Sequence, residues 1–93
     1  MRESEIERHL VMKAKWYGGH AIKFHAITTV GFPDRIVLLP GGRIAFVELK
    51  RPGEKPRKAQ EWWLQTLVNL GFTALWFDNK QDIDSWLAEF STK

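Results

Sequence analysis

Cysteine is absent from this 93-residue chain, so neither disulfides nor a thiolate zinc site can hold its fold together. No apolar run approaches the roughly 20 residues of a membrane-spanning helix. The first eight residues are rich in charge, unlike the apolar core of an export signal. We therefore expect one domain, residues 1–93, that makes no contact with a membrane and works in the reducing cytoplasm.

The composition fits a small folded domain. Hydrophobic residues make up 44% of the chain, and the five tryptophans and six phenylalanines are enough for a modest core. The net charge of +3 is too small to indicate a partner by itself.

Hydrophobic periodicity and turn residues predict the element order αβββαβα. Helices are expected at about residues 4–17, 56–70 and 81–90, and strands at residues 21–27, 35–39, 43–50 and 73–77. In the first strand Ile22, Phe24 and Ala26 alternate with polar residues. This order predicts an α/β fold with a central hairpin, and it fixes the fold class alone because strand order cannot be read from the pattern.

The second and third strands should form a hairpin, because Pro40-Gly41-Gly42 is turn sequence between two β-rich runs. A three-residue loop there pairs Leu39 with Arg43. The same register places Asp34 opposite Glu48. Since side chains alternate along a strand, one face of the hairpin should carry Asp34, Ile36, Leu38, Ile44, Phe46, Glu48 and Lys50.

Asp34, Glu48 and Lys50 would then meet at the polar end of that face. Two carboxylates suit Mg²⁺, which takes oxygen ligands and keeps several waters, and the backbone carbonyl of Leu49 could add another oxygen. Lys50 is suited to holding a water nucleophile or to neutralising charge on a phosphate. The alternative interpretation is a Pro-Asp turn beside a solvated Glu-x-Lys pair.

A basic segment follows this predicted site. Five of the nine residues from Lys50 to Lys58 are basic, and the segment runs into a helix N-terminus, where backbone N–H groups favour phosphate. A solvated loop is the alternative. The residues that we expect to contact DNA are Lys23, Arg51, Lys55, Arg57 and Lys58.

Aromatic and histidine residues carry weaker signals. Trp62 and Trp63 are adjacent and cannot share one face of a helix, so one of them should be exposed or lie in a subunit interface. For His9, His20 and His25 solvation is the favoured interpretation, because no pair of them has zinc-site spacing.

The order Gly31-Phe32-Pro33-Asp34, Phe46-Val47-Glu48-Leu49-Lys50-Arg51-Pro52-Gly53 and Gln60 resembles the VRR-NUC branch of the PD-(D/E)XK nucleases, in its small stand-alone form often carried by phages. The resemblance covers nearly the whole chain. It implies the PD-(D/E)XK restriction-endonuclease-like core, a mixed sheet flanked by helices.

The resemblance also implies roles for individual residues. Asp34 and Glu48 would bind Mg²⁺ or Mn²⁺, Lys50 would assist catalysis, and Gln60 would support the site. A first-helix glutamate would complete the metal site; Glu3 and Glu7 lie one helical turn apart and are equally good candidates, with Glu5 the weakest.

The function expected from these residues and the resemblance is a metal-dependent, structure-selective endodeoxyribonuclease. Its favoured substrate is branched DNA, as for Holliday-junction resolvases, and a homodimer would address both strands. Two alternatives stay open: a nonspecific or nicking DNase, and a non-catalytic nucleic-acid-binding accessory protein on the same scaffold. If a phage encodes the chain, its location would be the host cytoplasm.

Overall fold

The computed structural model of the chain describes residues 1–92. Its elements are α1 (Glu3–Trp16), β1 (His20–Lys23), β2 (Arg35–Leu39), β3 (Arg43–Leu49), α2 (Lys58–Asn69), β4 (Thr73–Phe77) and α3 (Lys80–Phe90). The predicted order αβββαβα is confirmed. No helix among residues 1–92 combines the length and the apolar character needed to cross a bilayer.

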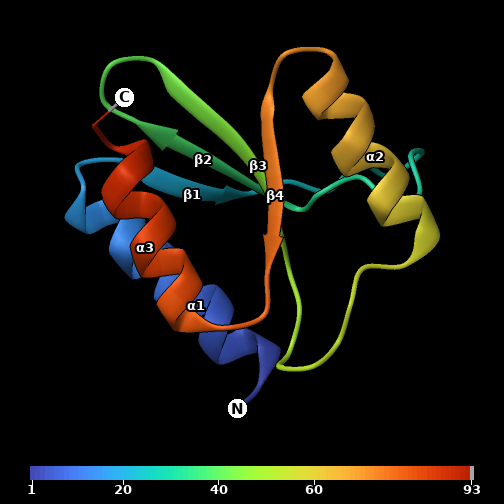
Figure 1. The fold of residues 1–93 in the computed structure, drawn as a ribbon, viewed down its shortest axis with the longest axis horizontal. Coiled ribbons are helices and arrows are strands. Elements are labelled where there is room, and N and C mark those ends of the chain that lie inside the picture. Colours follow the sequence, from blue (N-terminus) through green and yellow to red (C-terminus); the bar gives the residue numbers. More distant parts are fainter. Residues whose placement is uncertain (93) are drawn as a thin grey trace.

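The four strands form one mixed sheet in the order β1-β2-β3-β4. The first three strands pair antiparallel, whereas β4 runs parallel to β3 after the chain has crossed over through α2. Helices α1 and α3 lie together on one face of the sheet, and α2 lies on the other (Figure 1). The ends of β2 and β3 that carry the predicted site therefore lie between two helical layers.

The register of the β2–β3 hairpin is the predicted one. Leu39 pairs with Arg43, and Arg35 pairs with Val47, so Asp34 lies one step further along, across from Glu48. Gly41 and Gly42 take φ values of +87° and +73°, which residues with a side chain rarely adopt.

The main core lies between the sheet and the layer of α1 and α3. Its buried members are Ile6, Leu10, Ala14, Ala21, Val37, Leu39, Ala45, Val47, Leu49, Phe77, Ile83, Leu87 and Phe90. The members from β2 and β3 are every second residue of those strands, as the alternation predicts. Asp34 and Glu48 therefore lie on the opposite face of the hairpin.

The opposite face is only partly covered. Helix α2 buries Leu64 and Leu67, but Ile22 and Ile44 stay 48% and 45% exposed. Trp62 is also exposed, while Trp63 is half-buried with its ring 5.2 Å from that of Phe32, which confirms that the two tryptophans are divided between environments.

The predicted extent of the first strand was wrong. The strand ends at Lys23, and residues 24–33 form a loop instead of continuing to residue 27. The backbone N–H of Phe24 donates to the carbonyl of Asp34 at 2.8 Å, which closes the base of this loop. The prediction extended the strand too far because the loop also carries apolar residues at alternating positions, Phe24 and Ala26.

Candidate metal and nucleic-acid site

A hollow opens where β2 begins and β3 ends, beside the N-termini of α1 and α2. It has a volume of about 470 Å³ and is lined by Glu3, Asp34, Glu48, Lys50, Glu54, Lys55, Arg57 and Gln60. We call it the acidic lobe. The structure thus brings together Asp34, Glu48, Lys50 and Gln60, which are separated by up to 26 positions in the sequence.

Glu48 is the most perturbed acid in this lobe. Its residue is only 7% exposed, and burial together with the nearby Asp34 carboxylate raises its pKa from 4.5 to about 7, although Lys50 acts in the opposite direction. A buried carboxylate beside a second one is costly to ionise without a cation. This electrostatic arrangement fits a divalent metal ion.

Gln60 connects α2 to Glu48. Its Oε1 accepts the backbone N–H of Arg57 at 2.8 Å, which satisfies a free donor at the helix N-terminus. Its Nε2 therefore points away from the helix end and donates to Glu48 Oε2 at 3.3 Å. The helix start fixes which way the Gln60 amide faces.

Lys50 leaves the sheet at the floor of the lobe. Its backbone N–H donates to the Phe77 carbonyl at 2.9 Å, and its side chain is largely buried. Its Nζ lies 4.0 Å from Glu54 Oε1. Sequence reasoning gave Glu54 no role, although its place four residues after Lys50 was a usable signal.

The two first-helix candidates lie in different surroundings. Glu3 lines the acidic lobe, and its charge contributes to the raised pKa of Glu48. Glu7 instead forms ion pairs: its Oε2 is 3.2 Å from Arg35 and 3.3 Å from Lys23. Glu7 is not among the residues that line the lobe.

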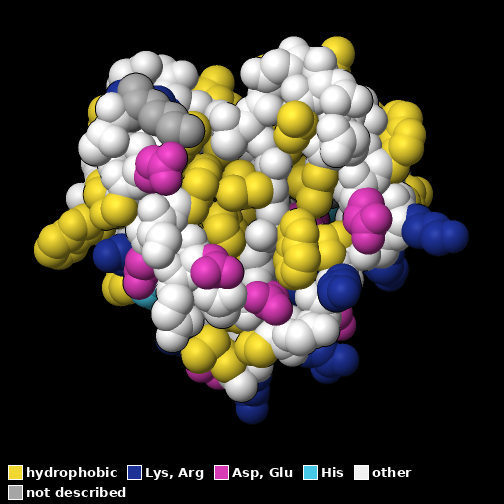
Figure 2. All heavy atoms as spheres, viewed as in Figure 1, with side chains coloured by type: hydrophobic (Ala, Val, Ile, Leu, Met, Phe, Trp, Pro, Cys, Tyr) yellow, Lys and Arg dark blue, Asp and Glu magenta, His cyan; other side chains and the backbone are white. Residues whose placement is uncertain are grey.

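Some of the residues expected to contact DNA lie at the acidic lobe, and others form ion pairs elsewhere. Lys55 and Arg57 line the acidic lobe, and Lys58 is exposed in the first turn of α2. Arg51 Nε lies 3.3 Å from Glu54 Oε2, while Lys23 pairs with Glu7, away from the lobe. In Figure 2, lysine and arginine side chains gather at the lower right, where the segment before α2 and the start of α2 lie.

Gly31 and Pro33 hold the segment before Asp34 in place. Gly31 has a φ of +86°, and a Cβ there would come within 2.7 Å of the Ala59 backbone. Pro33 is fully buried. The Gly-Phe-Pro-Asp sequence therefore packs directly against the first turn of α2, next to Gln60.

Within residues 1–92 no three Asp, Glu or His side chains are close enough to enclose a metal ion. The donor set still fits Mg²⁺ or Mn²⁺, since such ions commonly bind through one or two carboxylates plus water and substrate phosphate. Asp34 and Glu48, both of which line the lobe, are the two carboxylates predicted for this role. The Leu49 side chain is buried on the other face of the sheet, and the role of its carbonyl stays a prediction.

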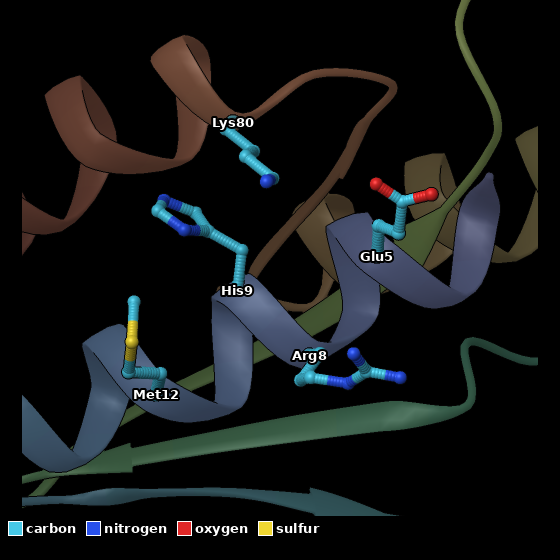
Figure 3. A pocket seen from close by; sticks show the side chains of 5 residues that line it. All are labelled: Glu5, Arg8, His9, Met12 and Lys80. Atoms are coloured by element: carbon cyan, nitrogen blue, oxygen red, sulfur yellow. The ribbon is translucent and has the colours of Figure 1, made fainter. Parts of the chain in front are cut away.

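A separate, smaller hollow of about 230 Å³ lies between α1 and α3 and is lined by Glu5, Arg8, His9, Met12 and Lys80. Lys80 extends from α3 toward α1, between His9 and Glu5 (Figure 3). The expectation that His9 is simply solvated was wrong: its Nε2 lies 2.7 Å from Asp84 Oδ1. His20 and His25 are exposed, as expected.

The fold and the acidic lobe define a class: an α/β protein that presents an Asp, a Glu and a Lys from adjacent strand ends beside a basic segment. No protein-family model matches the chain. It is, however, 45% identical over 87 residues to "Putative nuclease p44" of Acyrthosiphon pisum secondary endosymbiont phage 1, covering 94% of this chain and 92% of that protein.

Two solved structures are similar in fold. One, described as "VRR_NUC domain", is 26% identical, with 94% of each chain covered and a TM-score of 0.85. The other, a "VRR_NUC domain protein", is 18% identical, covers 99% of this chain and 89% of its own, and has a TM-score of 0.77. This chain belongs to the VRR-NUC family, as the sequence resemblance predicted.

Proposed function

We propose that this protein is a Mg²⁺- or Mn²⁺-dependent endonuclease that hydrolyses phosphodiester bonds in DNA. The observation that carries the proposal is the convergence of Asp34, Glu48 and Lys50 in the acidic lobe. Its wall also carries the basic residues Lys55 and Arg57. The raised pKa of Glu48 supports it, because that carboxylate gains most from a bound cation. The name of the phage relative agrees with this activity.

Most residues of the lobe have a part in the proposed reaction. Asp34 and Glu48 would hold the metal, and Glu3 is better placed than Glu7 to complete the site. When bound, the metal would polarise the phosphate and lower the pKa of water. Lys50 would orient the attacking water or neutralise charge as it develops on the phosphate.

The remaining groups position the reactants. Gln60 would hold the Glu48 carboxylate in one orientation through its side-chain amide, whose oxygen caps the start of α2. Arg57 and Lys55 on the wall of the lobe would bind the DNA backbone through its phosphates.

We include branched DNA and a homodimer in the proposal. Ile22, Ile44, Phe72 and Trp62 are large apolar side chains that α2 does not cover, each being 45–60% exposed. A second copy would bury them, and two copies would provide two sites for the two strands of a junction. Sedimentation of wild type and Ile44→Glu tests this: a dimer that the substitution splits supports it, and a monomeric wild type contradicts it.

The central experiment is cleavage of a labelled four-way junction beside matched duplex and single strand, with Mg²⁺, Mn²⁺ or EDTA. Wild type is compared with Lys50→Ala and with Lys15→Ala, which removes an exposed lysine at the far end of α1. Metal-dependent cutting that is lost only in Lys50→Ala supports the proposal. Binding without cutting in either metal would overturn the enzyme proposal and favour the alternative, a non-catalytic nucleic-acid-binding accessory protein.

A further inference from the structure

A second hollow shares a wall with the acidic lobe. It has a volume of about 320 Å³ and is lined by the loop of residues 24–32 together with Asp34, Glu48, Arg57 and Gln60. We call it the loop lobe. Because these last four residues also line the acidic lobe, the two hollows form one continuous cleft with the carboxylates at its centre.

The two lobes differ in chemistry. The walls of the acidic lobe are charged or polar throughout, whereas the loop lobe sets apolar side chains, among them Phe24, Ile27 and Val30, opposite the four charged or polar residues that the two lobes share. His25 and Thr29 of the loop also line it. Ile27 and Val30 are 85% and 82% exposed. Neither side chain belongs to the core, and neither has a part in the reaction proposed for the carboxylates.

The loop is fixed relative to the acids. The Phe24 N–H donates to the Asp34 carbonyl at 2.8 Å, and the rings of Phe24 and Phe32 meet edge to face at 5.7 Å. Its tip is turned by a bond from the Thr29 N–H to the Ala26 carbonyl at 3.2 Å. Ile27 and Val30 are thus held at a set place beside the carboxylates.

We propose that the loop lobe binds a nucleobase that is unpaired or extruded beside the scissile phosphate. This inference rests on the proposed function, because a phosphate bound beside Asp34 and Glu48 through the proposed metal ion would place the adjoining nucleoside at the mouth of the loop lobe. Apolar side chains that enter a base step, and apolar pockets that receive an unstacked base, are known means of handling such nucleotides.

A second protein copy is a poorer occupant of the loop lobe. Any chain filling it would cover Asp34, Glu48 and Arg57, which the proposed reaction needs open to DNA. A nucleotide instead supplies the flat face of a base for the apolar side chains of the loop and an anionic phosphate for Arg57. The site would therefore select DNA that already contains an unpaired nucleotide, since continuous duplex must first be unstacked at a cost.

The test compares wild type with the double variant Ile27→Ser/Val30→Ser, and uses Trp16→Ser, 79% exposed on α1 and outside both lobes, as control. Substrates are a duplex and the same duplex with one unpaired nucleotide next to the cut. We expect the double variant to lose about tenfold in cutting the second substrate while cutting of plain duplex stays within about twofold. Equal loss on both, or no loss, would overturn the proposal.

A binding measurement separates this inference from the proposed function. Lys50→Ala protein is mixed with DNA that carries 2-aminopurine at the unpaired position, and emission should rise on binding only while Ile27 and Val30 are present. If no DNA is cut by wild type but this signal appears, the subsite stands and the enzyme proposal fails. If DNA is cut without this signal, or if the double variant changes the oligomeric state, the subsite fails.

Discussion

Gln60 Nε2 donates a hydrogen bond to Glu48 Oε2 at 3.3 Å while the Oε1 of the same amide caps the first turn of α2 through the Arg57 N–H. One side chain thus secures a helix start and an acid on the sheet. Since the cap uses the oxygen, the nitrogen must face Glu48, so a change at Gln60 affects both the helix and the pKa of the carboxylate.

Gln60→Ala should lower kcat about 10- to 100-fold, the usual cost of removing a group that orients a metal ligand. The limb of the pH–rate profile that reports ionisation of Glu48 should also move to higher pH, because the donor that favours its charged form is gone. Steady-state cleavage across pH measures both effects. Gln65→Ala, which removes only an exposed pair with Asn69 on the same helix, is the control. An unchanged pH profile in Gln60→Ala would show that Gln60 acts only as a cap.

Glu48→Gln should stabilise the metal-free protein at pH 8 while abolishing cleavage. The folded pKa of Glu48 is about 7, above its ordinary 4.5, so the folded state loses stability as pH rises from about 4.5 through 7. The gain on substitution should be on the order of 3 kcal/mol at pH 8 and close to zero at pH 4.5. Urea unfolding in EDTA at the two pH values measures it. A gain that is equal at both pH values would contradict the assignment to this carboxyl.

Gly31→Ala should destabilise the protein more than Gly71→Ala. Both glycines have positive φ, +86° and +98°, so both substitutions carry backbone strain of roughly 1–2 kcal/mol. Only at Gly31 would the new Cβ also meet backbone, that of Ala59 at 2.7 Å, whereas nothing lies within 4 Å at Gly71. Thermal unfolding of the pair isolates the contact. Only Gly31→Ala should also reduce cleavage, because a shift of α2 would move Gln60. Equal melting temperatures in the two variants would show that α2 can shift away from the new Cβ at no cost in stability.

Lys55→Ala and Arg57→Ala should each reduce the dependence of DNA affinity on salt. A cation that contacts one phosphate contributes about one to the slope of log K against log salt concentration. Binding titrations between low and moderate salt, with Lys15→Ala as control, measure this slope. If the slope is the same in all three variants, neither side chain contacts a phosphate.

Much of the fold was predictable because its signals are local. The alternation in residues 35–50 and the Pro-Gly-Gly turn fix the hairpin register, and that register alone puts Asp34 across from Glu48. The first strand was predicted too long for the complementary reason. The apolar residues past Lys23 belong to a loop that lines a cleft, and apolar alternation does not show that pairing with β2 stops at Lys23 and Arg35.

The parts of the site that escaped prediction depend on partners distant in sequence. Glu3 and Glu7 share one helical face, so spacing cannot separate them; Arg35, 28 residues further on, pairs with Glu7 and leaves Glu3 at the lobe. Outside the site, His9 forms its side-chain contact with Asp84, which lies 75 residues further along the chain. No local pattern contains either pairing.

The hairpin has a consequence for how the protein folds. Asp34 and Glu48 lie at the open end of a hairpin whose turn is only three residues long, so a local structure brings them together, whereas Gln60 reaches Glu48 only when α2 docks. Like charges meet before their stabilising neighbour does. We therefore expect refolding in EDTA to slow as pH rises from about 4.5 toward 7, and divalent ions to restore its speed, so that the ion would act as a folding accelerator before it serves any reaction.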